Sequence, residues 1–250
     1  MTPPIPAIPP EPLRRCFVLH RRDYGNTSLI LDLFCAEAGR LPVLAKGAKR
    51  GRTPLAASLQ PFRPLWASWG GRGEVRVLAS AEPAGQALAL EGEALYCGLY
   101  LNELLTRLLG RGDSHPALFA FYHAALARLA GGELRETSLR QFELQLLGEL
   151  GYAPALDQAE EGPVLADGTY RCQVGQAPRR LPAWEGVRDG DEEVVSGGTL
   201  LALAAGEPLT DPGQAREARR LLRRLLAPHL GPRPLKSREL FRLARGKMSP

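Results

Sequence analysis

The hydrophobic pattern of the sequence changes period near residue 86, and this change constrains the fold more than any other feature. Before it, apolar and polar residues alternate in short runs such as RCFVLHRR, SLILDLF (28–34), LPVLAK (41–46) and EVRVLAS (74–80). After it, apolar residues recur at helical spacing. The chain is therefore predicted to be an α+β multidomain protein, with strands first and helices afterwards.

The N-terminal runs predict an OB-fold β-barrel over residues 13–82. About five short strands in so few residues fit a small closed barrel, for which the OB-fold is the obvious candidate. The run SLQPFRPLWASW (58–69) is interrupted by prolines, as an edge or bent strand would be. Residues 1–12 are too rich in proline for a helix or a central strand, so we expect a disordered tail there.

The remainder of the chain predicts an α-helical domain over 83–151 and 196–245. Helices are expected at 94–109, 115–130 and 133–150, with a short one at 199–206. Asp211 and Pro212 are typical of a helix start, and they open a last long helix over 213–231. Residues 152–195 lose the helical period and gain Gly, Pro and acids, so they form an irregular, acidic insert in this domain.

Charge is distributed unevenly along the chain. The net charge of +5 is the balance of +7 over residues 1–80, −4 over 81–150, −6 over 151–210 and +8 over 211–250. A positive field at two separated parts of the sequence suggests a polyanionic partner, although a basic surface also serves solubility alone. Two basic blocks favour nucleic acid.

A basic loop is predicted in the connection between the third and fourth strands. Lys46, Lys49, Arg50 and Arg52 lie within seven residues, spaced by glycines and free of acids. Side chains of this kind bind phosphate by charge, without reading base sequence. Phe62, Trp66 and Trp69 follow, and they either stack on bases or form barrel core.

The last long helix carries a second candidate surface for nucleic acid. Ala215, Ala218, Leu222 and Leu225 line one stripe of it. Five arginines gather on the other sides, and Glu217 is the only acid among them: Arg216, Arg219, Arg220, Arg223 and Arg224. Either these arginines contact nucleic acid or they form a solvated helix face.

Enzymatic and membrane functions find no support in the sequence. It contains no GxSxG, HExxH or GxGxxG motif, and its four histidines have no metal-ligand spacing. No apolar run approaches the length of a membrane span, and nothing resembles a signal peptide. Four scattered cysteines fit reduced thiols. We expect a cytoplasmic protein with no catalytic residues and no small-molecule substrate.

Four stretches, in order and spacing, resemble the bacterial RecO family. They are YGNTSLILDLF (24–34), LAKGAKRGRTPLAASLQPFRPL (44–65), RQFELQLLGELGYAPALD (140–157) and LLAPHLGPRPLKSREL (225–240). The resemblance extends from residue 13 to about residue 240.

This resemblance implies a recombination mediator for DNA repair that performs no catalysis. Family members bind single- and double-stranded DNA and anneal complementary strands. With the partner RecR they help to load RecA onto DNA coated by the single-stranded-DNA-binding protein (SSB). The resemblance also implies an OB domain followed by a helical domain with a small zinc-ribbon-like insert, and a protein associated with the nucleoid.

The insert departs from the family pattern at the zinc site. Many relatives bind zinc with two CxxC pairs after the GYxPxLD segment. Here only Cys172 remains, since Ala159, Gly162 and Gly175 occupy the other positions. A structural zinc site needs four N or S ligands. We therefore predict no zinc and no other cofactor.

Two other functions remain open. In the first, the chain is a non-catalytic scaffold whose basic ends bind acidic tails of partner proteins. In the second, it is an OB-fold protein of translation or ribosomal RNA. The salt dependence of the affinity distinguishes the first from DNA binding, because about 6–10 phosphate contacts lower affinity ~10³–10⁵-fold between 50 and 200 mM salt. A preference for RNA would favour the second.

Overall fold

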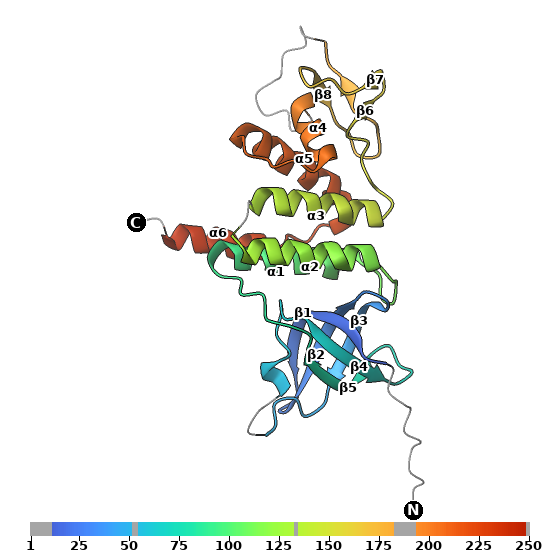
Figure 1. Cartoon of the computed structure of the whole chain (residues 1–250), viewed down its shortest axis with the longest axis vertical. Helices are drawn as coiled ribbons and strands as arrows, with labels where there is room; N and C mark the ends of the chain where they lie inside the picture. Colours follow the sequence, from blue (N-terminus) through green and yellow to red (C-terminus); the bar gives the residue numbers. More distant parts are fainter. Residues whose placement is uncertain (1–11, 52–54, 133–134, 183–193, 249–250) are drawn as a thin grey trace, which may run out of the picture. The chain divides into compact units, whose positions relative to one another are not determined.

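The computed structural model describes residues 12–51, 55–132, 135–182 and 194–248 (Figure 1). The chain divides into two compact units. The first comprises Met1–Glu91 and Gly98–Leu126, and the second comprises Gly92–Cys97 and Ala127–Pro250. The barrel and parts of two helices thus share a unit, whereas the sequence suggests a boundary at residue 82. Residues 1–11 of the expected tail lie outside the described residues.

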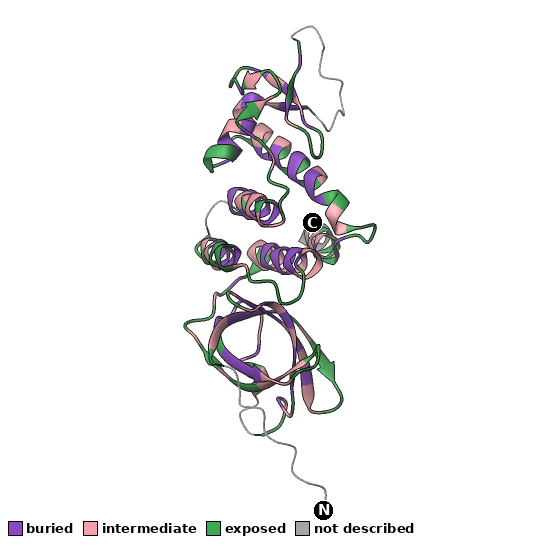
Figure 2. Ribbon diagram, turned by 90° about the vertical axis from the view of Figure 1, so that its right-hand side faces the viewer, coloured by how far each residue is buried: buried purple, intermediate pink, exposed green. Residues whose placement is uncertain are grey.

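Five strands close into a barrel in the first unit. They are β1 (Arg14–Tyr24), β2 (Ser28–Cys35), β3 (Gly39–Ala45), β4 (Leu65–Gly70) and β5 (Arg76–Pro83). Their order is β1-β2-β3-β5-β4, and β4 pairs with β1 to complete the ring seen in Figure 2. Only β3 and β5 run parallel. The predicted OB-like barrel is confirmed, including the position of the basic loop between β3 and β4.

The alternating pattern directs one side of each strand into the barrel. Along β3 every second residue is buried, as a period of two requires. The interior contains Val18, Leu31, Leu33, Val43 and Trp69. Two strands differ in length from the prediction. β1 continues beyond His20 to Tyr24, and β4 begins only at Leu65, after the prolines of the 58–69 run.

Aromatic packing joins β1 to a helix within the first unit. Phe17 of β1 is fully buried, and its ring centroid lies 5.5 Å from that of Phe119 and 5.2 Å from that of Tyr122. Both partners belong to α2 (Pro116–Ala130). Asn102 of α1 (Gly92–Leu108) donates to the Leu19 carbonyl at 2.9 Å and accepts from the Tyr122 hydroxyl. These contacts fix α1 and α2 to the strand whose far end carries the site described below.

The second unit is built around α5 (Pro212–Leu230). It packs on α3 (Arg135–Glu149) and α4 (Gly197–Ala205) through buried leucines such as Leu146, Leu222 and Leu226. A further helix, α6 (Lys236–Met248), follows the one expected to be the last, and its Phe241 lies edge-on to Tyr96. No helix in the described part is both long and apolar enough to span a membrane.

The described residues of the insert form small sheets instead of irregular chain. Strands β6 (Gln158–Ala159) and β7 (Gly162–Pro163) make a hairpin. Strands β8 (Thr169–Arg171), β9 (Arg179–Arg180) and β10 (Val194–Ser196) make a sheet in the order β10-β8-β9. Tyr170 is buried, and its hydroxyl accepts a hydrogen bond from the Leu165 amide at 2.8 Å. Periodicity fails to predict strands of two or three residues because they are shorter than one repeat of a clear pattern.

Phe17→Ala should lower the free energy of unfolding by about 3–5 kcal/mol, because it removes a fully buried ring that packs on α2 and leaves a cavity. Urea titration followed by tryptophan fluorescence measures this, since Trp66 and Trp69 both lie in the barrel. Leu13→Ala is the control: Leu13 is half exposed, so its loss should change the value by less than about 0.5 kcal/mol. Equal effects of the two changes would contradict the packing described here.

Candidate nucleic-acid interface

The basic loop, residues 46–51, is a tight turn that depends on glycine. Gly47 has φ of +65° and Gly51 has φ of +92°, values that other residues rarely adopt. The Arg50 amide donates to the Gly47 carbonyl at 2.9 Å, which closes the turn. The cations are therefore held on a compact backbone.

Three hydrogen bonds attach the basic loop to its neighbours. The Lys49 amide donates to the Thr27 carbonyl at 2.9 Å, and the Gly47 amide donates to Ser28 Oγ at 3.2 Å. Thr27 lies in the junction between β1 and β2, and Ser28 is the first residue of β2. The Ala56 amide donates to the Ala48 carbonyl at 2.9 Å, and the Ala48 side chain is buried in the barrel core. Because Ala48 is anchored in the core, Lys46, Lys49 and Arg50 are held at the end of the barrel.

The predicted cations differ in how accessible they are. Lys46 and Arg50 are exposed. Lys49 is less exposed, and its Nζ lies 2.6 Å from Asp23 Oδ1. This carboxylate neutralises part of the charge that Lys49 would offer to a phosphate. Arg52 lies outside the described residues.

Two exposed residues of β1 join the basic loop, and the sequence analysis missed both. Arg22 and Tyr24 lie in the last part of the strand, beside the β1–β2 junction. The apolar–polar alternation ends at His20, and the four residues that follow, RRDY, carry three charged side chains in a row. Periodicity therefore gives no signal for this part of β1.

Burial decides the role of the three aromatic residues near β4. Trp69 is 1% exposed and Phe62 is 7% exposed, so the suggestion that they stack on bases is wrong for both. Phe62 adopts φ of +63° and packs on Gly98 of α1, where an added Cβ would meet its ring at 2.9 Å. Trp66 is 40% exposed and points outward, between Arg15 of β1 and Glu82 of β5 in the strand register.

In the second unit, α5 separates apolar and basic residues onto opposite faces. Asp211 caps the helix by accepting from the Gln214 amide at 2.8 Å, and Pro212 occupies the first turn. The buried residues include every one predicted for the apolar stripe. At 100° per residue, the five arginines fall on the opposite face, where four are exposed and Arg224 is partly buried. Arg219 forms an ion pair with Glu136 of α3. The helix thus presents a basic face, and Glu136 neutralises part of its charge.

The positions that correspond to the zinc site of the family lack three of its four ligands. Ala159 and Gly162 pair with each other across the β6–β7 hairpin. Cys172 is buried, and burial raises the pKa of its thiol to about 11. In the described ranges, no three His, Cys, Asp or Glu side chains are placed to hold a metal ion. The residues present do not fit zinc, and the expectation of a metal-free insert stays a prediction.

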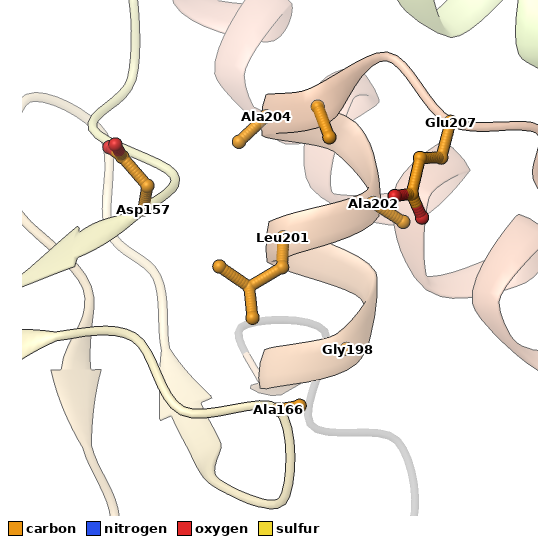
Figure 3. A pocket seen from close by; sticks show the side chains of 8 residues that line it. Asp157, Ala166, Gly198, Leu201, Ala202, Ala204 and Glu207 are labelled. Atoms are coloured by element: carbon orange, nitrogen blue, oxygen red, sulfur yellow. The ribbon is translucent and has the colours of Figure 1, made fainter.

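A shallow hollow of about 570 Å³ lies between the insert and α4 (Figure 3). Its walls are mostly small and apolar, and include Gly198, Leu201 and Ala202. The charged side chains that line it are Asp157 and Glu207. Two carboxylates repel phosphate, so this hollow is not part of the candidate interface.

Both parts of the chain match known protein families. Residues 13–87 match the family described as Recombination protein O N terminal, and residues 89–239 match Recombination protein O C terminal. The chain is 48% identical over 251 residues to the DNA repair protein RecO of Methylococcus capsulatus, which covers 94% of this chain and 99% of that protein. It is 47% identical over 232 residues to the DNA repair protein RecO of Yersinia pestis and of Yersinia pseudotuberculosis, covering 92% of this chain and 93% of each relative.

The native thiols should react slowly with a thiol reagent at pH 8. Burial raises the pKa of Cys35, Cys97 and Cys172 to about 11 and that of Cys16 further, and a raised pKa leaves less of the reactive thiolate. Against an ordinary thiol of pKa about 8.5, the thiolate fraction falls by about two orders of magnitude. The reaction rate is measured from the absorbance of the thiolate that the reagent releases, in buffer and in denaturant. A cysteine that reacts equally fast in both would contradict the burial.

Proposed function

The chain belongs to the RecO family of DNA repair proteins, and from this membership we propose that it is a DNA-binding recombination mediator that anneals complementary strands. The observation that carries the proposal is the basic loop, held at the end of an OB-like barrel by its own backbone hydrogen bonds. A cation on a fixed backbone loses less conformational freedom when it binds phosphate than one on a free tail.

In this proposal the basic loop binds the phosphate backbone of single-stranded DNA. Lys46 and Arg50 are exposed and Arg22 stands nearby on β1, so several positive charges face solvent at one end of the barrel. Phosphate contacts of this kind release counterions and carry no sequence preference. A mediator must act at any damaged sequence, which such binding allows.

The arginine face of α5 supplies the second DNA-binding surface of the proposal. Two strands approach each other against the repulsion of their phosphates, and cations reduce that repulsion. A protein with one basic surface on each unit can hold two strands at once. Annealing of the two strands forms a duplex, and the same two surfaces also bind this duplex.

The proposal extends to the partners that the family implies. RecR joins the protein, SSB covers the DNA on which they act, and RecA is loaded onto that DNA. The protein performs no catalytic step in this scheme, binds no small-molecule substrate and works in the cytoplasm, at the nucleoid.

One observation favours the alternative of a scaffold that binds acidic protein tails. Leu240 and Leu243 of α6 are exposed, at 48% and 64%, and Arg242 lies between them in sequence. Apolar side chains beside a cation suit a peptide that is both acidic and apolar. Binding of that kind would depend on salt less steeply than binding to DNA.

Lys46/Arg50→Ala should weaken binding to single-stranded DNA and flatten its dependence on salt. Removing two phosphate contacts lowers the slope of log affinity against log salt by about 1.4. Fluorescence anisotropy of a labelled oligonucleotide, titrated at several salt concentrations, measures both quantities. Arg179/Arg180→Ala is the matched control, because it removes two exposed arginines from the insert and leaves the same net charge. Equal losses of affinity in the two variants would mean that only the net charge of the protein matters, which would contradict the proposal.

Arg216/Arg220→Ala should slow annealing and leave the affinity of the barrel for single strands largely intact. Both arginines are exposed on α5, so their loss leaves the apolar face of the helix unchanged. Quenching between a fluorophore and a quencher on complementary oligonucleotides measures the annealing rate. Annealing at the native rate would remove α5 from the mechanism.

A further inference from the structure

Two cross-strand rows on the outer face of the barrel end at the basic loop. Arg22 of β1 pairs with Ile30 of β2, which pairs with Leu44 of β3. One step further, Tyr24 pairs with Ser28, and Lys46 follows the last paired residue of β3. Residues directly opposite each other in a sheet point to the same side. Tyr24, Arg22 and Lys46 therefore share the outer face.

The position of Tyr24 relative to the basic loop is fixed by hydrogen bonds. Its pairing partner Ser28 accepts, through Oγ, the amide hydrogen of Gly47. With strands about 4.8 Å apart, Tyr24 and Lys46 lie about 10 Å from each other across β2. Asp23, next to Tyr24, holds Lys49 at 2.6 Å from the other side of the strand. The tyrosine is thus built into the same surface as the cations.

Tyr24 offers an aromatic ring to solvent where the charge is positive. It is 54% exposed, more than Trp66 at 40%. Trp66 pairs with Arg15, nine residues earlier on β1, so it lies about 30 Å from Tyr24 along the strand, with Glu82 beside it. Arg22 and Lys46 share the outer face with Tyr24, so an exposed ring and cations, the two requirements of single-strand binding, occur together there. Trp66 has one cation and one carboxylate as its cross-strand neighbours, Arg15 and Glu82, and these two charges offset each other.

We propose that Tyr24 stacks on an unpaired base of a single DNA strand whose phosphates are bound by Arg22, Lys46 and Arg50. This inference rests on the proposed function and adds the residue that makes this site bind single strands in preference to duplex. The base pairs of a duplex are stacked on one another, so their faces are closed to the ring. An unpaired base has a free face, and every base has one, so the contact gives no sequence preference.

Tyr24→Leu should weaken binding to a labelled deoxythymidine oligonucleotide about 5- to 150-fold, the equivalent of about 1–3 kcal/mol for one stacked base. Its affinity for duplex should not change, and neither should the slope of its salt dependence, because no charge is removed. Tyr24→Phe keeps the ring and should bind like the native chain. Trp66→Leu, the matched control at the other end of the strand, should also bind like the native chain.

An oligonucleotide with abasic sites gives a second readout that a structural disturbance of the loop would not imitate. The native chain should bind the abasic strand more weakly than the intact strand. Tyr24→Leu should bind the two strands equally, because the variant has no ring to stack on a base in either complex. Native binding to single strands with no loss in Tyr24→Leu overturns this inference and leaves the proposed function standing. An equal loss on single strands, abasic strands and duplex also overturns it, since it would mean a damaged loop. No binding of the native chain to single strands overturns both.

Discussion

The candidate interface depends on the anchoring of the basic loop by an alanine that belongs to the barrel core. Ala48 is 2% exposed, while the amides on either side of it, at Gly47 and Lys49, bond to the β1–β2 junction. A hydrophobic side chain thus anchors a charged segment. The backbone of the loop loses its conformational entropy when the barrel folds, and not when DNA binds. The same hydrogen bonds place the exposed end of β1 beside the loop.

Ion pairs within the protein set how much of its positive charge is available to a partner. Asp23 holds Lys49 in the barrel, and Glu136 holds Arg219 on α5. Each pair is partly exposed, so it competes only weakly with a phosphate and is screened by salt. Counting cations in the sequence therefore overestimates the field at both surfaces, although it locates them correctly.

The sequence predicted the elements better than the exposure of their side chains. The barrel, the connection with the basic loop and the two faces of α5 follow from periods of two and of 3.6 residues. Periodicity cannot say which aromatic side chains near a proline-broken strand point inward, and for this reason Phe62 and Trp69 were considered for stacking. It also missed Tyr24, because β1 crosses a register shift between Val18 and His20 that interrupts the alternation. Helix α6 was missed because two prolines precede it and its start resembles a loop.

Hydrogen exchange of the full chain, with and without a deoxythymidine oligonucleotide, tests whether a fixed basic loop on the barrel binds single-stranded DNA. We expect slower exchange of the amides in 24–28 and 45–51 when the oligonucleotide is bound, because the DNA would cover both segments. We expect no change in 158–171 of the acidic insert. Protection confined to the insert, with the two barrel segments unaffected, would contradict DNA binding by the loop.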